Sequence, residues 1–204
     1  MFLVVGLGNP GAEFAGTRHN IGWEVLDALA GRFGWTRGSS DEFGRLARAK
    51  FDSLTMDGNV AVGGRSEKLL LLKPLTYMNL SGRAVQAAMA FYQLSTPQVL
   101  VALDDMALPV GTLRMRPGGS SGGHNGLKDI ERALATSQYP RLRLGIDPPP
   151  PRVPGKDYVL GRFSPEQRPW MDNAVKKAAD AVICWMENGI ETTMNRFNAK
   201  EETE

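Results

Sequence analysis

The chain has 204 residues, a size that suits a single globular domain with a sizeable core. Its hydrophobic content of 42% is ordinary for a globular protein, and no apolar run approaches the length of a membrane span. The single cysteine, Cys184, excludes an intrachain disulfide and a cysteine zinc cluster, and with no signal peptide in view we expect a cytoplasmic protein.

In chain order, the first half of the sequence predicts a buried strand over 2–7, a helix over 20–34 with Asn20 as its N-cap, a polar loop over 35–45, and strands over 45–51 and 68–74. The second half predicts a helix over 79–94, strands over 98–105 and 111–117, a Gly-rich loop over 118–123, a helix over 124–135, a strand over 141–146, a Pro-rich connector over 147–157, and a helix over 164–190 that starts with Ser164 as N-cap. This alternation of strands and helices predicts an α/β sandwich with a mixed sheet.

The net charge of +2 is small, but the charge is unevenly distributed. Residues 111–162 contain nine Lys or Arg and four Asp or Glu, an excess of +5 over about a quarter of the chain. A local basic surface of this kind favours a polyanionic partner such as nucleic acid. The alternative is an ordinary solvated face.

The opening strand runs into Gly6, Gly8 and Gly11, which spell the G-x-G-x-x-G pattern of dinucleotide-binding turns. That motif requires a helix that begins within the glycines and a second strand ending in an acidic residue about 20 positions later. Here the helix pattern starts near residue 20 and no strand follows until about residue 45. We therefore expect no dinucleotide cofactor.

Several catalytic chemistries fit poorly. Two histidines with Asp104 or Asp105 could supply metal ligands, but no H-x-H or H-x-x-x-H spacing is present, so we expect no metal. Ser81 lacks the G-x-S-x-G context of a hydrolase nucleophile and falls inside a predicted helix. Cys184 lies among apolar helix residues, as a small core residue would.

The remaining candidates are histidine, carboxylate and amide groups. His19 and His124 each lie in a Gly- or Asn-rich stretch just before a predicted helix, where functional residues are common. Asp104, at the end of a predicted strand, could hold an imidazole in one tautomer while that imidazole takes a proton from water. The amides of Asn9, Asn79 and Asn125 could bind a carbonyl or an oxyanion, although each could equally be a turn or cap residue.

Five ordered blocks resemble those of the bacterial peptidyl-tRNA hydrolase family: VVGLGNPGAEFAGTRHNIGW, KPLTYMNLSG, LDDMALPVG, GGSSGGHNGLKDI and RLRLGI. The resemblance implies a monomeric, single-domain three-layer sandwich with a twisted mixed β-sheet flanked by helices, which we place at residues 1–198 with a frayed tail at 199–204. It also implies hydrolysis of the ester between a peptide and the 3′-terminal ribose of tRNA, without a cofactor. The implied partner is peptidyl-tRNA, contacted at its acceptor stem, 3′ CCA end and 5′-phosphate.

The resemblance also implies roles for individual residues. His19 corresponds to the catalytic base, Asp104 to its acidic partner, and Asn9 to an amide of the catalytic pocket. The implied contacts to the peptide or to tRNA come from Phe14, Met78, Asn79, His124, Asn125, Arg114, Arg116 and Arg143. Among these, Arg116 and Arg143 correspond to a clamp on the 5′-phosphate, with Arg114 in an auxiliary role.

Some positions depart from the commonest family pattern. Ala107 replaces an acid, Phe14 stands where tyrosine is common, and arginine occupies clamp positions where lysine is frequent. Two other functions remain open: an RNA-binding protein without activity, and a small-molecule esterase. The retained His19, Asp104 and amide set disfavours the first, and the Arg116–Arg143 pair disfavours the second.

Overall fold

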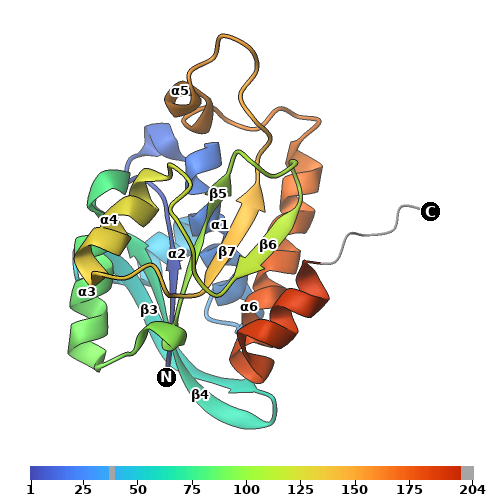
Figure 1. Ribbon diagram of the computed structural model, residues 1–204. Coiled ribbons are helices and arrows are strands. Elements are labelled where there is room, and N and C mark those ends of the chain that lie inside the picture. Colours follow the sequence, from blue (N-terminus) through green and yellow to red (C-terminus); the bar gives the residue numbers. More distant parts are fainter. Residues whose placement is uncertain (37–39, 199–204) are drawn as a thin grey trace.

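The computed structural model describes residues 1–36 and 40–198, and it contains a mixed seven-stranded sheet between two layers of helices (Figure 1). The strands are β1 (Phe2–Gly6), β2 (Arg48–Lys50), β3 (Ser53–Val62), β4 (Arg65–Pro74), β5 (Val99–Asp105), β6 (Leu113–Arg116) and β7 (Arg141–Gly145). They lie in the order β2-β3-β4-β1-β5-β7-β6. Strands β4, β1, β5 and β7 are parallel, whereas β2, β3 and β6 add antiparallel pairs toward the edges.

The helices are α1 (Ile21–Arg32), α2 (Ser40–Leu46), α3 (Ser81–Tyr92), α4 (Asn125–Leu134), α5 (Gly155–Val159) and α6 (Arg168–Phe197), with short 3-10 turns η1 (Ala12–Phe14), η2 (Arg18–Asn20), η3 (Met78–Leu80) and η4 (Thr96–Gln98). Among the described helices, none is both long and apolar enough to cross a membrane.

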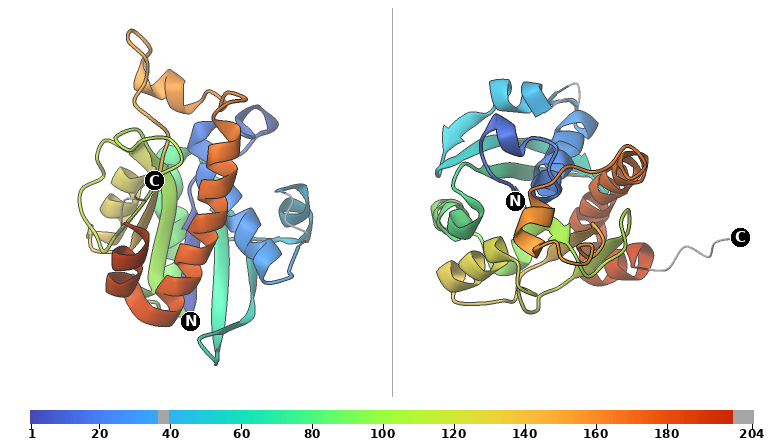
Figure 2. Two further views of the ribbon diagram at one scale, coloured as in Figure 1. Left: turned by 90° about the vertical axis from the view of Figure 1, so that its right-hand side faces the viewer. Right: turned by 90° about the horizontal axis from the view of Figure 1, so that it is seen from above.

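The two faces of the sheet have separate cores. Figure 2 shows the helices that cover the sheet from the side and from above. Along β1 the side chains alternate: Val4 packs with α1 and α6, whereas Leu3 and Val5 pack with α3 and α4. The central parallel strands are buried on both faces, which explains their continuous apolar sequences. The predicted three-layer α/β fold is confirmed. The tail predicted at 199–204 lies outside the described residues.

The structure differs from the predicted elements in three places. Part of the loop predicted over 35–45 is helix α2, which buries Phe43. The long strand β3 was missed because its centre reads Asp57-Gly58-Asn59, poor strand formers; pairing with β4 over ten residues supplies its stability. The last helix begins at Arg168, one turn later than predicted, and it continues past a non-helical Gly189 to Phe197. Ser164 still caps the turn that precedes it: the Ser164 hydroxyl accepts a hydrogen bond from the Gln167 backbone N–H at 3.3 Å, and the Gln167 side chain accepts one from the Ser164 backbone N–H at 3.2 Å.

The glycines of the first turn serve helix packing. A Cβ atom on Gly6 would lie 2.3 Å from the carbonyl oxygen of Gly22, so α1 can cross the end of β1 only because glycine stands at that point. Helix α1 begins at Ile21, well after the glycines, whereas a dinucleotide-binding turn needs a helix that begins within them.

Candidate active site

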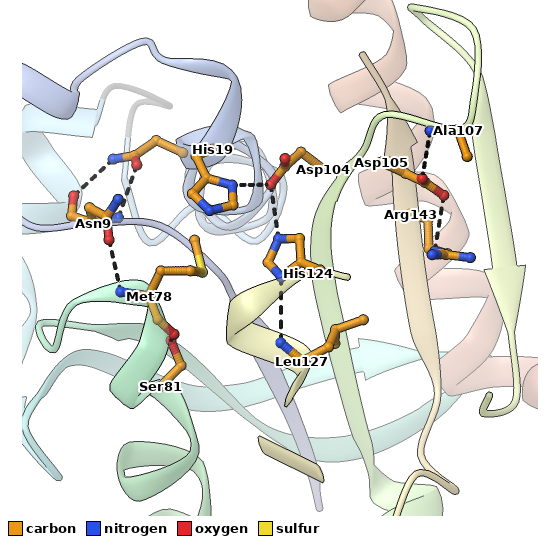
Figure 3. Close-up of polar contacts among 11 residues, drawn as sticks. Asn9, His19, Met78, Ser81, Asp104, Asp105, Ala107, His124, Leu127 and Arg143 are labelled. Carbon is orange, nitrogen blue, oxygen red and sulfur yellow. Dashed lines mark hydrogen bonds and ion pairs between the residues drawn. The ribbon is translucent and has the colours of Figure 1, made fainter. Parts of the chain in front are cut away.

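Four parallel strands end at one edge of the sheet, and several of the predicted site residues lie at that edge or in the loops beyond it. The loop after β1 carries Asn9 and His19, the segment after β4 carries Met78, and the end of β5 carries Asp104. The first residue before α4, His124, lies across from them (Figure 3). Parallel strand direction thus brings together side chains that are more than 100 residues apart in the sequence.

His19 and His124 share one carboxylate oxygen. His19 Nδ1 lies 2.7 Å from Asp104 Oδ1, and His124 Nε2 lies 3.1 Å from the same atom (Figure 3). His124 Nδ1 accepts a hydrogen bond from the Leu127 backbone N–H at 3.4 Å, so the proton of a neutral His124 belongs on Nε2. A carboxylate can only accept, and His19 therefore carries its proton on Nδ1, which leaves His19 Nε2 as a free acceptor.

Asp104 is buried, with 3% of its surface exposed. Burial by itself would raise the pKa of the Asp104 carboxyl group, but the charges and hydrogen bonds of His19 and His124 outweigh it and hold the pKa below its ordinary value. Asp104 is thus a fixed negative charge beneath two imidazole rings. Such a charge stabilises an imidazolium formed during proton transfer.

The same three side chains have the composition of a metal site. Their ligand atoms lie within 4.8 Å of one another, the one such group found in the described part of the chain. In the observed arrangement, the histidine nitrogens that face Asp104 are its hydrogen-bond donors. A bound metal would have to replace both of those protons, so the hydrogen-bonded cluster fits proton transfer better than metal binding.

Asn9 lies on the other side of His19 and is held from two directions. The Asn20 side chain accepts a hydrogen bond from the Asn9 backbone N–H at 2.9 Å and donates one to the Asn9 carbonyl at 3.0 Å. The Met78 backbone N–H donates to Asn9 Oδ1 at 2.8 Å (Figure 3). With Oδ1 occupied, Asn9 Nδ2 has no partner among the described residues and is left to donate to a ligand.

The predicted cap role of Asn20 is therefore wrong. Asn20 stands at the N-cap position of α1, but its side chain makes no capping bond and is committed to Asn9. The sequence does not mark Asn20 as a site residue, because its position before a helix is that of an ordinary cap. The available hint was its place next to His19, since both follow the Asn9 turn by about ten residues.

A close approach between α4 and η3 joins the two halves of the site. A Cβ atom on Gly126 would lie 2.6 Å from Met78 Sδ and 3.2 Å from His124 Cε1. Only glycine at this first turn of α4 lets Met78 and His124 pack against the same helix end.

A cleft of about 460 Å³ opens over His19 and Asp104. Its other walls come from residues 105–107, 121–125, 148–149, 155–156 and 159, together with Arg143. The Pro-rich connector predicted at 147–157 thus borders the site. Of the predicted residues, His19, Asp104, His124, Asn125 and Arg143 line this cleft directly.

Asp105 orients the basic side of the cleft rather than His19. Asp105 Oδ2 lies 3.0 Å from Arg143 Nε, and Asp105 Oδ1 accepts the Ala107 backbone N–H at 2.9 Å (Figure 3). Because the backbone of residue 107 makes this bond, an alanine there serves as well as an acid. These contacts assign Asp105 to Arg143 rather than to His19.

The remaining predicted residues lie outside the cleft lining. Arg114 and Arg116 are exposed on the edge strand β6, and the register places Arg114 opposite Arg143, and Arg116 opposite the buried Arg141. Asn79 is exposed beside Met78, and Phe14 is half-buried in η1. Their roles stay predictions.

A larger cavity of about 650 Å³ lies between α1 and the start of α6 and contains none of the predicted site residues. Its wall includes a buried ion pair in which Lys73 Nζ lies 2.5 Å from Asp27 Oδ1. Burial lowers the pKa of the Lys73 ammonium group, against the opposing effect of Asp27. Lys73 and Asp27 form an ion pair with each other. The smaller cleft instead contains His19, whose Nε2 can accept a proton.

The sequence and the fold were compared with those of known proteins, and both comparisons point to the same family. The sequence profile of the family described as peptidyl-tRNA hydrolase matches residues 3–204. Proteins named peptidyl-tRNA hydrolase from Caldanaerobacter subterraneus subsp. tengcongensis and Rhodopirellula baltica are 46% and 41% identical, covering 97% and 100% of this chain and all of each relative. The crystal structure of peptidyl-tRNA hydrolase from Acinetobacter baumannii superposes with a TM-score of 0.85 at 34% identity, covering 98% of this chain and 95% of that one.

Proposed function

This chain belongs to the peptidyl-tRNA hydrolase family and hydrolyses peptidyl-tRNA, and we propose that it does so by general-base attack of water activated by His19. The observation that carries the proposal is the 2.7 Å hydrogen bond from His19 Nδ1 to Asp104, because it leaves Nε2 of this cleft-lining side chain as the acceptor. General-base catalysis of this kind contributes roughly 10²–10⁴-fold to a rate.

In the proposed reaction, water gives a proton to His19 Nε2 as its oxygen attacks the ester carbonyl carbon. The ester C–O bond then breaks, and the proton returns from His19 to the departing ribose oxygen, which releases the free peptide acid and tRNA. Asp104 stabilises the intervening imidazolium and prevents the ring from turning. His124 holds the same Asp104 oxygen from the other side.

The carbonyl oxygen gains negative charge during the attack, and Asn9 supports it in this proposal. Its Nδ2 donor is free, while two hydrogen bonds with Asn20 and one from Met78 fix the residue in place. A donor that is oriented before the reaction stabilises an oxyanion without further reorganisation. Asn79 and Asn125, both exposed at helix starts beside the site, extend this set of amides along the substrate.

The distribution of charge along the cleft indicates which way the bound substrate is oriented. Arg143 lines one end of the cleft, and Arg114 and Arg116 continue the basic surface along β6, whereas Asn9 and Met78 lie beyond His19 at the other end (Figure 3). The tRNA acceptor stem and its 5′-phosphate then lie on the arginine side, where guanidinium groups bind phosphate bidentately. The 3′ CCA end reaches His124 and Asn125, and the peptide extends past Met78 and Phe14. We further propose that the enzyme acts as a monomer in the cytoplasm.

The test is release of N-acetyl-amino acid from N-acetyl-aminoacyl-tRNA by the wild type and His19→Ala, each with and without EDTA. A fall of about 10²–10⁴-fold in kcat for His19→Ala, with tRNA binding retained, supports the assignment. Equal activity in both proteins would refute His19 as the base. Loss of wild-type activity in EDTA, restored by a divalent metal, would instead make the His19–Asp104–His124 cluster a metal centre.

A further inference from the structure

Arg18, the residue before His19, is buried without an acidic partner. Only 9% of its surface is exposed, and in the described part of the chain no carboxylate lies within 4.0 Å of its guanidinium. The guanidinium carbon lies 4.1 Å from the ring centre of Tyr158 and 5.3 Å from that of Phe163. A buried charge is costly unless it is compensated, and here the aromatic faces and neutral acceptors compensate it.

Three polar contacts of Arg18 join the His19 loop to α5 and to the segment that follows it. Arg18 Nη1 donates to the Tyr158 carbonyl at 3.3 Å, Nη2 donates to Gln167 Oε1 at 3.1 Å, and the backbone N–H donates to the Gly161 carbonyl at 3.0 Å. These bonds span about 140 positions of sequence. The loop that carries His19 is therefore attached to residues 158–167 through one side chain and its backbone.

Helix α5 is also a wall of the cleft. Gly155, Lys156 and Val159 line the cleft that contains His19. On the far side of α5, the Tyr158 hydroxyl donates to the Ile146 carbonyl at 2.5 Å, just beyond the end of β7. Tyr158 thus ties α5 to the sheet through its hydroxyl and to Arg18 through its ring and carbonyl.

We propose that Arg18 is a positioning residue for the hydrolysis, because its side chain locks the α5 wall to the loop carrying His19. This inference rests on the proposed function of His19. While these Arg18 contacts hold, the distance between α5 and His19 Nε2 stays fixed. A substrate bound against α5 then places its ester carbonyl next to His19. A displacement of about 1 Å in such a geometry can reduce a rate by about 10²-fold.

The experiment compares Arg18→Met and Arg18→Lys with Arg162→Met as the matched control. Arg162 joins the same two segments, since its Nε donates to the Ala15 carbonyl at 3.2 Å, but its side chain is exposed. We expect kcat to fall by about 10-fold or more in Arg18→Met, with a smaller fall in Arg18→Lys, which keeps the charge but not the planar stacking group. Arg162→Met should stay within about 2-fold of the wild type.

Two further readouts separate positioning from stability. The downfield NMR signal of the His19 Nδ1 proton should broaden or disappear in Arg18→Met and persist in Arg162→Met. Added guanidinium ion, at concentrations that do not unfold the protein, should restore part of the kcat of Arg18→Gly. If Arg18→Met is too unstable to assay, the kcat of Arg18→Lys and the rescue of Arg18→Gly decide the question.

A wild-type kcat and an unchanged His19 proton signal in the Arg18 variants, with only a lower melting temperature, would overturn the proposal. His19→Ala distinguishes that failure from failure of the proposed function. If His19→Ala is inactive while Arg18→Met is fully active, only the positioning role of Arg18 is refuted. If His19→Ala is itself active, the assignment of the base is wrong.

Discussion

Replacing Asp104 by asparagine tests the shared-oxygen geometry, because asparagine keeps an oxygen and removes the charge. His19 and His124 both donate to Oδ1, so the new amide can accept both bonds if its oxygen takes that position. What is lost is the charge that strengthens each bond. Hydrogen bonds to charged groups contribute about 1.5–3 kcal/mol and neutral ones about 0.5–1.5 kcal/mol.

The expected effect of Asp104→Asn follows from that difference. A loss of about 1.4 kcal/mol of imidazolium stabilisation corresponds to about a 10-fold fall in kcat. Asp104→Ala removes the acceptor as well, leaves two buried N–H groups unpaired and frees the His19 ring to turn. Its kcat should fall by about 10³-fold, within the range that general-base catalysis contributes.

The assay is hydrolysis of N-acetyl-aminoacyl-tRNA by both variants as a function of pH. The pKa of Asp104 is held below the ordinary carboxyl range, so its charge is present above that range and is lost only as the pH falls through the lowered value. Above about pH 5, the ratio of wild-type to Asp104→Asn activity should therefore show no change caused by protonation of Asp104 itself. Equal and severe losses in Asp104→Asn and Asp104→Ala would refute the reasoning, because they would mean that the amide cannot hold the His19 tautomer.

Three further predictions concern neighbouring features. Asn20→Ala should cost about 1–3 kcal/mol of unfolding free energy and lower kcat, because the Asn9 backbone loses both partners; urea unfolding and kinetics check this, and an unchanged kcat would contradict it. Lys73→Met should lower the free energy of unfolding by about 3–5 kcal/mol with little effect on kcat, because it leaves Asp27 without its ion-pair partner Lys73. The double variant Lys73→Met/Asp27→Leu should lose clearly less than the sum of the two single losses, as measured by denaturant unfolding. Additive losses would show that the two residues are not coupled. Arg116→Gln should reduce the salt dependence of tRNA binding, lowering the slope of log K against log salt by about 0.7–0.9, whereas an unchanged slope would remove Arg116 from the phosphate contacts.

The sequence by itself determined the class of fold and the edge of the sheet where the site lies. Continuous apolar strands such as residues 99–103, separated by helix patterns, specify a parallel sheet buried on both faces. Because parallel strands end at a common edge, the segments that carry His19 and Met78 and the strand end that carries Asp104 lie at that edge. The five ordered blocks then pointed to the reaction.

Only the tertiary structure decided how those residues are joined. Strand β3 depends on pairing with β4 that its own sequence does not signal, and the β6–β7 register rather than residue spacing placed Arg114 opposite Arg143. Asn20 has the sequence of a helix cap but bonds to Asn9, eleven residues earlier. The sharing of one Asp104 oxygen by two histidines is likewise invisible in the chain. The physical reason is that hydrogen bonds are short and directional, so their partners are chosen only after packing has fixed the distances between loops.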